Sequence, residues 1–69
     1  MNDEPLLAHF AVRDLPPRLA EVARPFGELA HGIVQSLPRH PERTVALRKV
    51  LEGMDAALRA ARYYTPPEG

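Results

Sequence analysis

Apolar side chains recur at helical spacing along two stretches of the chain. Between residues 19 and 37 they follow one another at steps of three or four, and they are Leu19, Val22, Phe26, Leu29, Ile33 and Leu37. Between residues 47 and 61 a second stripe has similar spacing, formed by Leu47, Val50 or Leu51, Met54, Leu58 and Ala61. One stripe of this kind is typical of an amphipathic helix, so the pattern predicts two helices.

Prolines indicate where these helices begin and end, because proline lacks the N–H that a helix interior needs. Pro38 is expected to end the first helix, and Pro41 suits the first turn of the second, with a short turn near residues 38–40 that makes the helices antiparallel neighbours. Asp14 is a candidate N-cap of the first helix. Pro25 lies inside the first stripe, so we expect a kink there or a break into two helical pieces.

The predicted fold is therefore all-α: an antiparallel two-helix hairpin over residues 14–63, with a proline-kinked first helix. Residues 1–13 form an amino-terminal arm, whose apolar part, 6–13, is expected to be extended or to form a helical turn. Residues 64–69 are expected to be a flexible tail. Four side chains should be buried between the helices: Ile33, Val50, Leu51 and Met54.

A chain of 69 residues rarely builds a sufficient core alone, and disulfides, a metal or a partner subunit usually supply the rest. The chain has no cysteine, and its three histidines are too scattered for a metal site. We therefore expect a homo-oligomer. The second helix also carries a flank of small residues, which predicts either a subunit interface or simply high helix propensity: Ala46, Gly53, Ala56, Ala57 and Ala60.

Charge and hydropathy limit the kinds of partner that the chain is expected to bind. Nine basic and nine acidic residues cancel, so no overall field attracts the chain to DNA, RNA or a membrane. No stretch approaches the roughly 20 apolar residues that span a bilayer. The acidic start Met1-Asn2-Asp3-Glu4 does not resemble a secretory signal, so a cytoplasmic location is expected.

The residues that catalysis needs are not arranged for it. The only serine, Ser36, has no glycine-rich turn around it, and Glu21 and Glu28 lie on what reads as a solvated face. His31 follows Glu28 by one turn, as in an ordinary surface pair. We expect neither an enzyme nor a cofactor.

One candidate binding site remains, at the start of the second helix. The first N–H groups of a helix lack intrahelical partners, and the helix dipole favours anions there. Arg39 and Arg43 bring phosphate donors to this end, and Thr44 adds a hydroxyl. Arg48 and Lys49 lie one turn further along the helix. The pattern favours an anion site of modest specificity, and the alternative is a solvated helix start.

The same stretch resembles a known family. It reads Phe26-x-x-Leu29-Ala30-x-x-Ile33-x-x-x-Leu37-Pro38-x-x-Pro41-Glu42-Arg43-Thr44-Val45-Ala46-Leu47-Arg48-Lys49-Val50-Leu51-Glu52 and is similar to the hairpin of phage anti-CBASS cyclic-oligonucleotide sponges, which Thoeris anti-defence sponges share. The positions that match the family pattern are Pro38, Glu42, Thr44 (for serine), Ala46, Leu47, Val50 (for leucine) and Glu52. His40-Pro41 replaces the family's Ser-Arg, Arg48 its threonine and Ala56 its tryptophan.

The resemblance implies a homo-oligomer, hexameric in the cyclic-nucleotide sponges, that captures cyclic di- or trinucleotides between protomers without cleaving them. By position, Arg43 and Thr44 would hold phosphates, with Arg39 or Arg48 compensating for the lost arginine, and Phe10 or His9 would stack on a base. A phage-encoded protein of this kind would act in the host cytoplasm. The alternative is a structural or adaptor oligomer that contacts only proteins.

Overall fold

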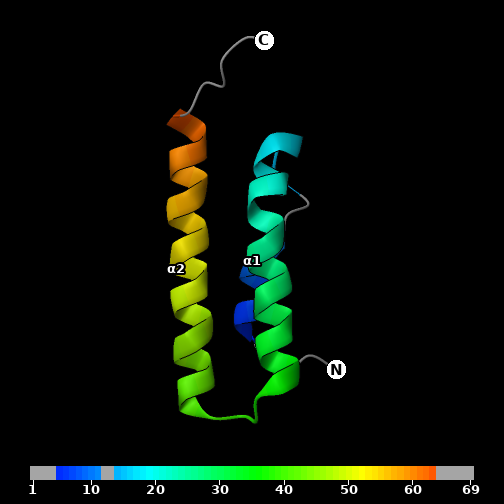
Figure 1. The fold of residues 1–69 in the computed structure, drawn as a ribbon, viewed down its shortest axis with the longest axis vertical. Coiled ribbons are helices and arrows are strands. Elements are labelled where there is room, and N and C mark those ends of the chain that lie inside the picture. Colours follow the sequence, from blue (N-terminus) through cyan, green and yellow to red (C-terminus); the bar gives the residue numbers. More distant parts are fainter. Residues whose placement is uncertain (1–4, 12–13, 64–69) are drawn as a thin grey trace.

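Two antiparallel α-helices form the body of the molecule in the computed structural model, and a short 3₁₀ helix packs against both (Figure 1). The structure describes residues 5–11 and 14–63. Its elements are η1 (Pro5–Phe10), α1 (Pro17–Ser36) and α2 (Pro41–Tyr63). The predicted helical hairpin is confirmed. What the sequence predicts for residues 1–4, 12–13 and 64–69 lies outside the described residues.

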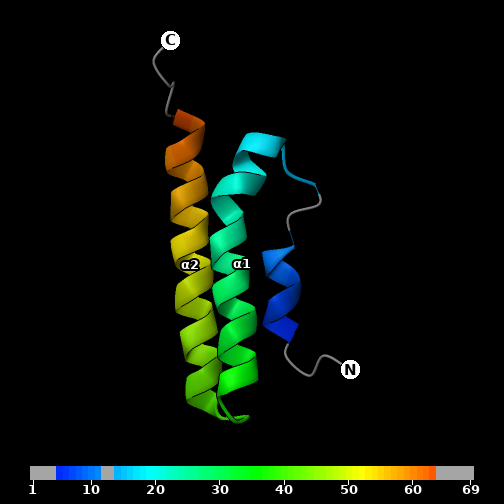
Figure 2. The same ribbon diagram turned by 45° about the vertical axis from the view of Figure 1, so that its right-hand side comes forward.

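The start of α1 differs from the prediction. Pro16 is the N-cap residue and Pro17 the first helical residue, and no side chain caps this end. Asp14 as the N-cap is therefore wrong, because a cap must immediately precede the first helical residue. The helix continues through Pro25, so a break into two pieces is also wrong. Figure 2 shows the first turns of α1 inclined to the rest of the helix.

The turn between the α-helices occupies residues 37–40, close to the predicted position. Leu37 is the extended C-cap residue of α1, and its N–H donates to the Ile33 carbonyl oxygen at 3.1 Å. Pro41 begins α2, as predicted. Because this connection is so short, the end of α1 and the start of α2 are held next to each other.

The core is formed where the two helices and η1 meet. The second apolar stripe is confirmed, since α2 buries Leu47, Met54, Leu58 and Ala61. The first is wrong in part: Leu29 is 54% exposed and Leu37 46% exposed, whereas Ala23 and Ala30 are fully buried. Side chains of this size let the helix backbones approach closely, so the buried line of α1 passes through its alanines. The three other residues expected between the helices, Ile33, Val50 and Leu51, are half-buried against this core.

The arm forms a helical turn, one of the two conformations expected for it. Within η1, Leu7 and Phe10 are buried. Gly27 allows the approach of η1 to α1, because a Cβ added there would lie 3.5 Å from the Phe10 carbonyl oxygen. Figure 1 shows η1 behind the two α-helices, and Figure 2 shows it beside α1. Element η1 thus covers one face of the hairpin, and no element within residues 5–11 and 14–63 covers the opposite face.

Within residues 5–11 and 14–63, no helix combines the length and apolar character that a bilayer crossing requires.

Candidate ligand-binding site

The predicted anion site lies at the tip of the hairpin, where α2 begins. His40 is placed to cap this end: its Nδ1 accepts the Glu42 N–H at 3.0 Å, and its carbonyl oxygen accepts the Arg43 N–H at 2.9 Å and the Thr44 N–H at 3.4 Å. Pro41 has no N–H. The first donors of α2 therefore have partners inside the chain, and the expectation of outward-pointing, unpartnered N–H groups is wrong for this structure.

Arg43 lies inside the hairpin rather than on its surface. The residue is 6% exposed, and its Nη1 donates to the carbonyl oxygens of Leu37 at 3.2 Å and Val34 at 3.5 Å. The last carbonyl groups of a helix lack intrahelical donors, and a guanidinium there is favoured by the helix dipole. Arg43 thus serves the end of α1. Its predicted role in holding phosphate remains a prediction and would have to compete with these contacts.

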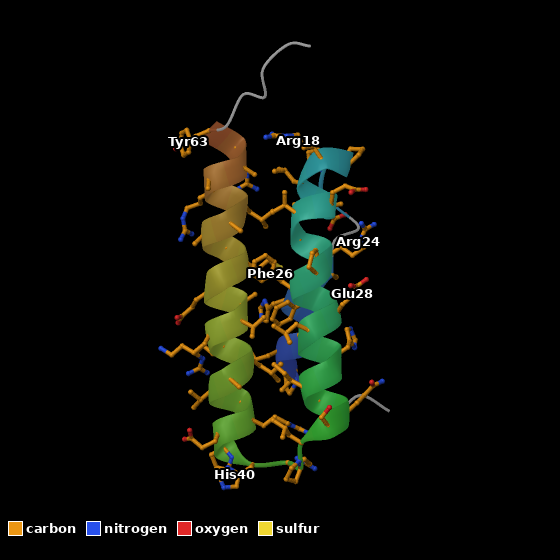
Figure 3. The ribbon with its side chains drawn as sticks, in the orientation of Figure 1. Arg18, Arg24, Phe26, Glu28, His40 and Tyr63 are labelled. Carbon is orange, nitrogen blue, oxygen red and sulfur yellow. The ribbon has the colours of Figure 1, made fainter. Side chains whose placement is uncertain are left out.

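A similar arginine contact joins the two α-helices at the other end of the hairpin. Arg18, in the first turn of α1, donates from Nη1 to the Ala61 carbonyl oxygen in the last turn of α2 at 2.9 Å. Figure 3 shows Arg18 between the two helix ends. Each α-helix therefore receives an arginine donor at its carboxyl end from the start of the other helix.

The remaining basic residues of the predicted site are accessible. Arg39 and Arg48 are exposed, and Thr44 is half-buried. A hollow of about 260 Å³ lies at the same tip, lined by Leu37, Pro38, His40, Glu42 and Arg43. Its lining is mainly apolar, and Glu42 opposes the arginine charge. This hollow alone is poorly suited to a doubly charged phosphate.

A larger groove lies along the outer side of α1, beside the end of the arm. It has a volume of about 470 Å³ and is lined by Phe10 of η1 and by Arg24, Gly27, Glu28, His31, Gly32 and Gln35 of α1. A Cβ added at Gly32 would meet nothing within 4 Å, so the backbone there is open to an incoming molecule. Figure 3 shows Arg24 and Glu28 projecting from α1 away from α2.

The groove presents several kinds of polar group within a short distance along the helix. Arg24 offers a cationic fork, which also contacts Glu21 Oε1 at 3.5 Å in an exposed ion pair. Such pairs are weak, so the guanidinium can exchange this partner for a stronger one. Glu28 offers an acceptor, and His31 and Gln35 can each donate and accept. Together they offer a cation, hydrogen-bond donors and hydrogen-bond acceptors along one side of the groove.

The structure places the predicted site residues in two regions. Arg39, Arg43 and Thr44 lie at the hairpin tip, with Arg48 one turn further along α2. Phe10 borders the groove instead, and it is only 5% exposed, so most of its ring packs in the core. His9 is exposed on the arm. The tip hollow and the groove share no lining residue, so one protomer does not gather the predicted residues into one site.

Sequence reasoning missed the polar side of the groove. Arg24, Glu28, His31 and Gln35 recur at steps of four, three and four, which places them along one face of α1. This periodicity is visible in the sequence, but it is also typical of a solvated helix face. Only the position of η1 beside that face distinguishes a groove from ordinary surface.

Comparisons with known proteins assign no function to either region. No protein-family model, curated protein or solved structure matches the chain. Among the described residues, no group of three or more His, Cys, Asp or Glu side chains is arranged to hold a metal ion.

Proposed function

We propose that this protein is a non-catalytic binding protein that sequesters cyclic di- or trinucleotide immune messengers as a homo-oligomer, in the manner of the phage anti-defence sponges that its hairpin resembles. The all-helical hairpin is compatible with the proposal, because the resemblance implies a fold of this kind. Because a helical hairpin is a common architecture, the fold does not identify the function, which depends on the binding site.

The groove beside Phe10 is the main structural support for nucleotide binding. Small-molecule sites in proteins usually measure roughly 300–1,000 Å³ and combine apolar walls with a few polar groups. The groove, at about 470 Å³, falls in this range and places an arginine, a carboxylate, an imidazole and an amide next to an aromatic side chain. Arg24 suits a phosphate, and Glu28 and Gln35 suit the polar edge of a base.

Assembly is part of the proposal because the groove is open on one side. A cyclic nucleotide carries at least two phosphates, and Arg24 is the only arginine among the residues that line the groove. Exposed Arg39 and Arg48 lie elsewhere on the same protomer. In a homo-oligomer, of which the hexamer is the form that the resemblance implies, a second protomer would supply a basic group to the open side.

A specific observation favours a second function. The resemblance assigns Arg43 and Thr44 to the phosphates and Phe10 or His9 to base stacking. Of these residues, Arg43 and Phe10 are buried and both hold the protomer together. This arrangement suits a structural or adaptor hairpin whose surface contacts only proteins. The two functions predict opposite results in a binding experiment.

Calorimetric titration with a panel of cyclic di- and trinucleotides distinguishes them. We expect at least one ligand to bind the wild-type protein at micromolar concentration or tighter, and Arg24→Ala to weaken that binding at least tenfold, about 1.4 kcal/mol. Arg59→Ala is the matched control, since Arg59 is exposed on α2 and does not line the groove. If no ligand of the panel binds the wild-type protein, the adaptor function replaces the sponge.

A further inference from the structure

Among the described residues that line the groove beside Phe10, Glu28 supplies the only carboxylate. Its side chain is exposed, and Figure 3 shows it projecting from α1 away from α2. Within residues 5–11 and 14–63 it has no hydrogen-bond or ion-pair partner, whereas Arg24, one turn earlier, contacts Glu21 Oε1 at 3.5 Å. Both carboxylate oxygens of Glu28 are therefore available to a molecule in the groove.

Two glycines leave the surface of α1 next to Glu28 without side chains. Gly32 follows Glu28 by one turn, and a Cβ added there would meet nothing within 4 Å. Gly27 directly precedes Glu28 where η1 approaches, and a Cβ added there would lie 3.8 Å from Phe10 Cβ. Residues four apart lie on the same face of a helix. A planar ring can therefore lie against the bare backbone at Gly32 with one edge toward the Glu28 carboxylate.

A carboxylate distinguishes the nucleobases because it accepts hydrogen bonds and donates none. Of the four common bases of RNA, only guanine presents two adjacent donors, N1–H and the N2 amino group, on its Watson–Crick edge. Adenine and cytosine each present one donor beside a ring-nitrogen lone pair, and uracil presents one donor between two carbonyl oxygens. Guanine therefore makes two hydrogen bonds to a carboxylate, while every other base makes one and turns a lone pair toward a negatively charged oxygen.

The other polar side chains of the groove do not select among the bases in this way. His31 and Gln35 can each donate and accept, so they can contact the edge of any base. Arg24 only donates, and its guanidinium suits a phosphate, which every nucleotide carries. Among the described residues, Glu28 is the one lining side chain that accepts without donating, so base selectivity depends on it.

We infer that the groove selects guanine, whose N1–H and N2 amino group donate to the two oxygens of Glu28 while the ring lies over Gly32. The inference rests on the proposed function and names the base by which the site distinguishes one cyclic nucleotide from another. A site that hydrogen-bonds one ligand discriminates against an analogue without the matching groups, because its own polar atoms are then left unpaired.

Calorimetric titration of the full chain with cyclic di-GMP and cyclic di-AMP tests the inference, because these ligands have the same backbone and charge and differ only in the base. We expect the wild-type protein to bind cyclic di-GMP at least about tenfold more tightly. Glu28→Gln places a donor beside an acceptor, which matches adenine, so this variant should lose the preference or reverse it. Glu52→Gln is the matched control: it makes the same change at an exposed position of α2 outside the groove and should keep the preference.

A second variant decides the case if Glu28→Gln does not fold. Gly32→Leu places a side chain where the ring would lie and where the chain itself has nothing within 4 Å, so it should stay helical by circular dichroism and lose cyclic di-GMP binding. Equal wild-type affinity for the two ligands, tighter binding of cyclic di-AMP, or an undiminished guanine preference in Glu28→Gln overturns the inference and leaves the proposed function intact. If the wild-type protein binds no cyclic nucleotide, both fall together.

Discussion

Arg18 and Ala61 join the two ends of the chain's helical part: the Arg18 guanidinium, near the start of α1, donates to the Ala61 carbonyl oxygen, near the end of α2, at 2.9 Å. Arg43 makes the corresponding contact at the tip, from the start of α2 to the carbonyl oxygens of Val34 and Leu37. Both contacts place a cation at a helix carboxyl end, where the dipole is negative. The hairpin is thus held at both ends by hydrogen bonds and along its length by apolar packing.

The buried contact at the tip should matter for stability. Hydrogen bonds that involve a charged group contribute roughly 1.5–3 kcal/mol, and removing one partner leaves buried acceptors without a donor. We expect Arg43→Ala to lower the free energy of unfolding by about that amount, measured by urea denaturation. Arg48→Ala, on the exposed side of the same helix, should change it by less than about 0.5 kcal/mol. Equal stability of the two variants would show that Arg43 does not hold the tip.

Packing at the centre of the hairpin should contribute more to stability than the Arg43 contacts do. Leu47 is the largest fully buried side chain, and truncation of a core leucine to alanine usually costs about 2–5 kcal/mol. We expect Leu47→Ala to be largely unfolded at 37 °C by circular dichroism, because so small a chain has little stability to lose. Val45→Ala, whose parent side chain is 40% exposed, should melt close to the wild type. If Leu47→Ala melted at the same temperature as Val45→Ala, Leu47 would not belong to the core.

The cap at the start of α2 should contribute to stability. His40 Nδ1 accepts the Glu42 N–H at 3.0 Å, and the His40 carbonyl oxygen accepts the N–H groups of Arg43 and Thr44. A side chain in this position stabilises the helix, because it supplies a partner that the first N–H groups lack within the helix.

Two variants isolate this effect in thermal melts. His40→Asn keeps a side-chain acceptor at the cap position, and His40→Ala removes the acceptor, at a usual cost of about 1 kcal/mol. We expect the wild type and His40→Asn to melt at similar temperatures and His40→Ala to melt at a lower one. Equal melting of the wild type and His40→Ala would mean that the imidazole does not cap α2.

The hairpin itself was predictable because its signals are local. Proline positions and apolar spacing indicate where α2 begins and which of its residues are buried, including Met54 and Leu58. The buried line of α1 was not predictable in the same way. A hydropathy pattern weights large side chains, whereas the fold buries Ala23 and Ala30 completely and leaves Leu29 more than half exposed. That choice depends on how closely the two backbones approach, which is a property of the pair.

In the candidate site, too, local features could be predicted from the sequence and packing between elements could not. A cluster of arginines at a helix start is visible in the sequence, but the direction of each side chain is not. Arg43 turns inward because the carbonyl end of α1 lies within its reach, and this follows from the length of the turn. His40 as the cap could have been inferred, since a helix start at Pro41 makes it the preceding residue. The groove beside Phe10 depends on the docking of the arm, for which the sequence contains no local signal.

Ionic strength should separate ligand binding from association between subunits, because the two depend differently on charge. Attraction between Arg24 and a phosphate is screened by salt, with a Debye length of about 10 Å at 0.1 M and about 3 Å at 1 M. We expect nucleotide binding, measured by calorimetry, to weaken between 50 mM and 500 mM NaCl. The mass of the oligomer should stay the same or increase, because apolar association is not screened. Binding that is insensitive to salt would argue against a phosphate contact.

Native mass spectrometry tests the proposed function most directly, because one spectrum reports both the number of subunits and any bound ligand. After incubation with the panel of cyclic di- and trinucleotides, we expect an assembly at a multiple of the 7.7 kDa protomer, six being the expected number, with added mass equal to whole ligands. Denaturation should then release the same nucleotide uncleaved. Protomers or assemblies that carry no ligand from the panel at micromolar concentration, or a ligand recovered as a cleaved product, would contradict sequestration.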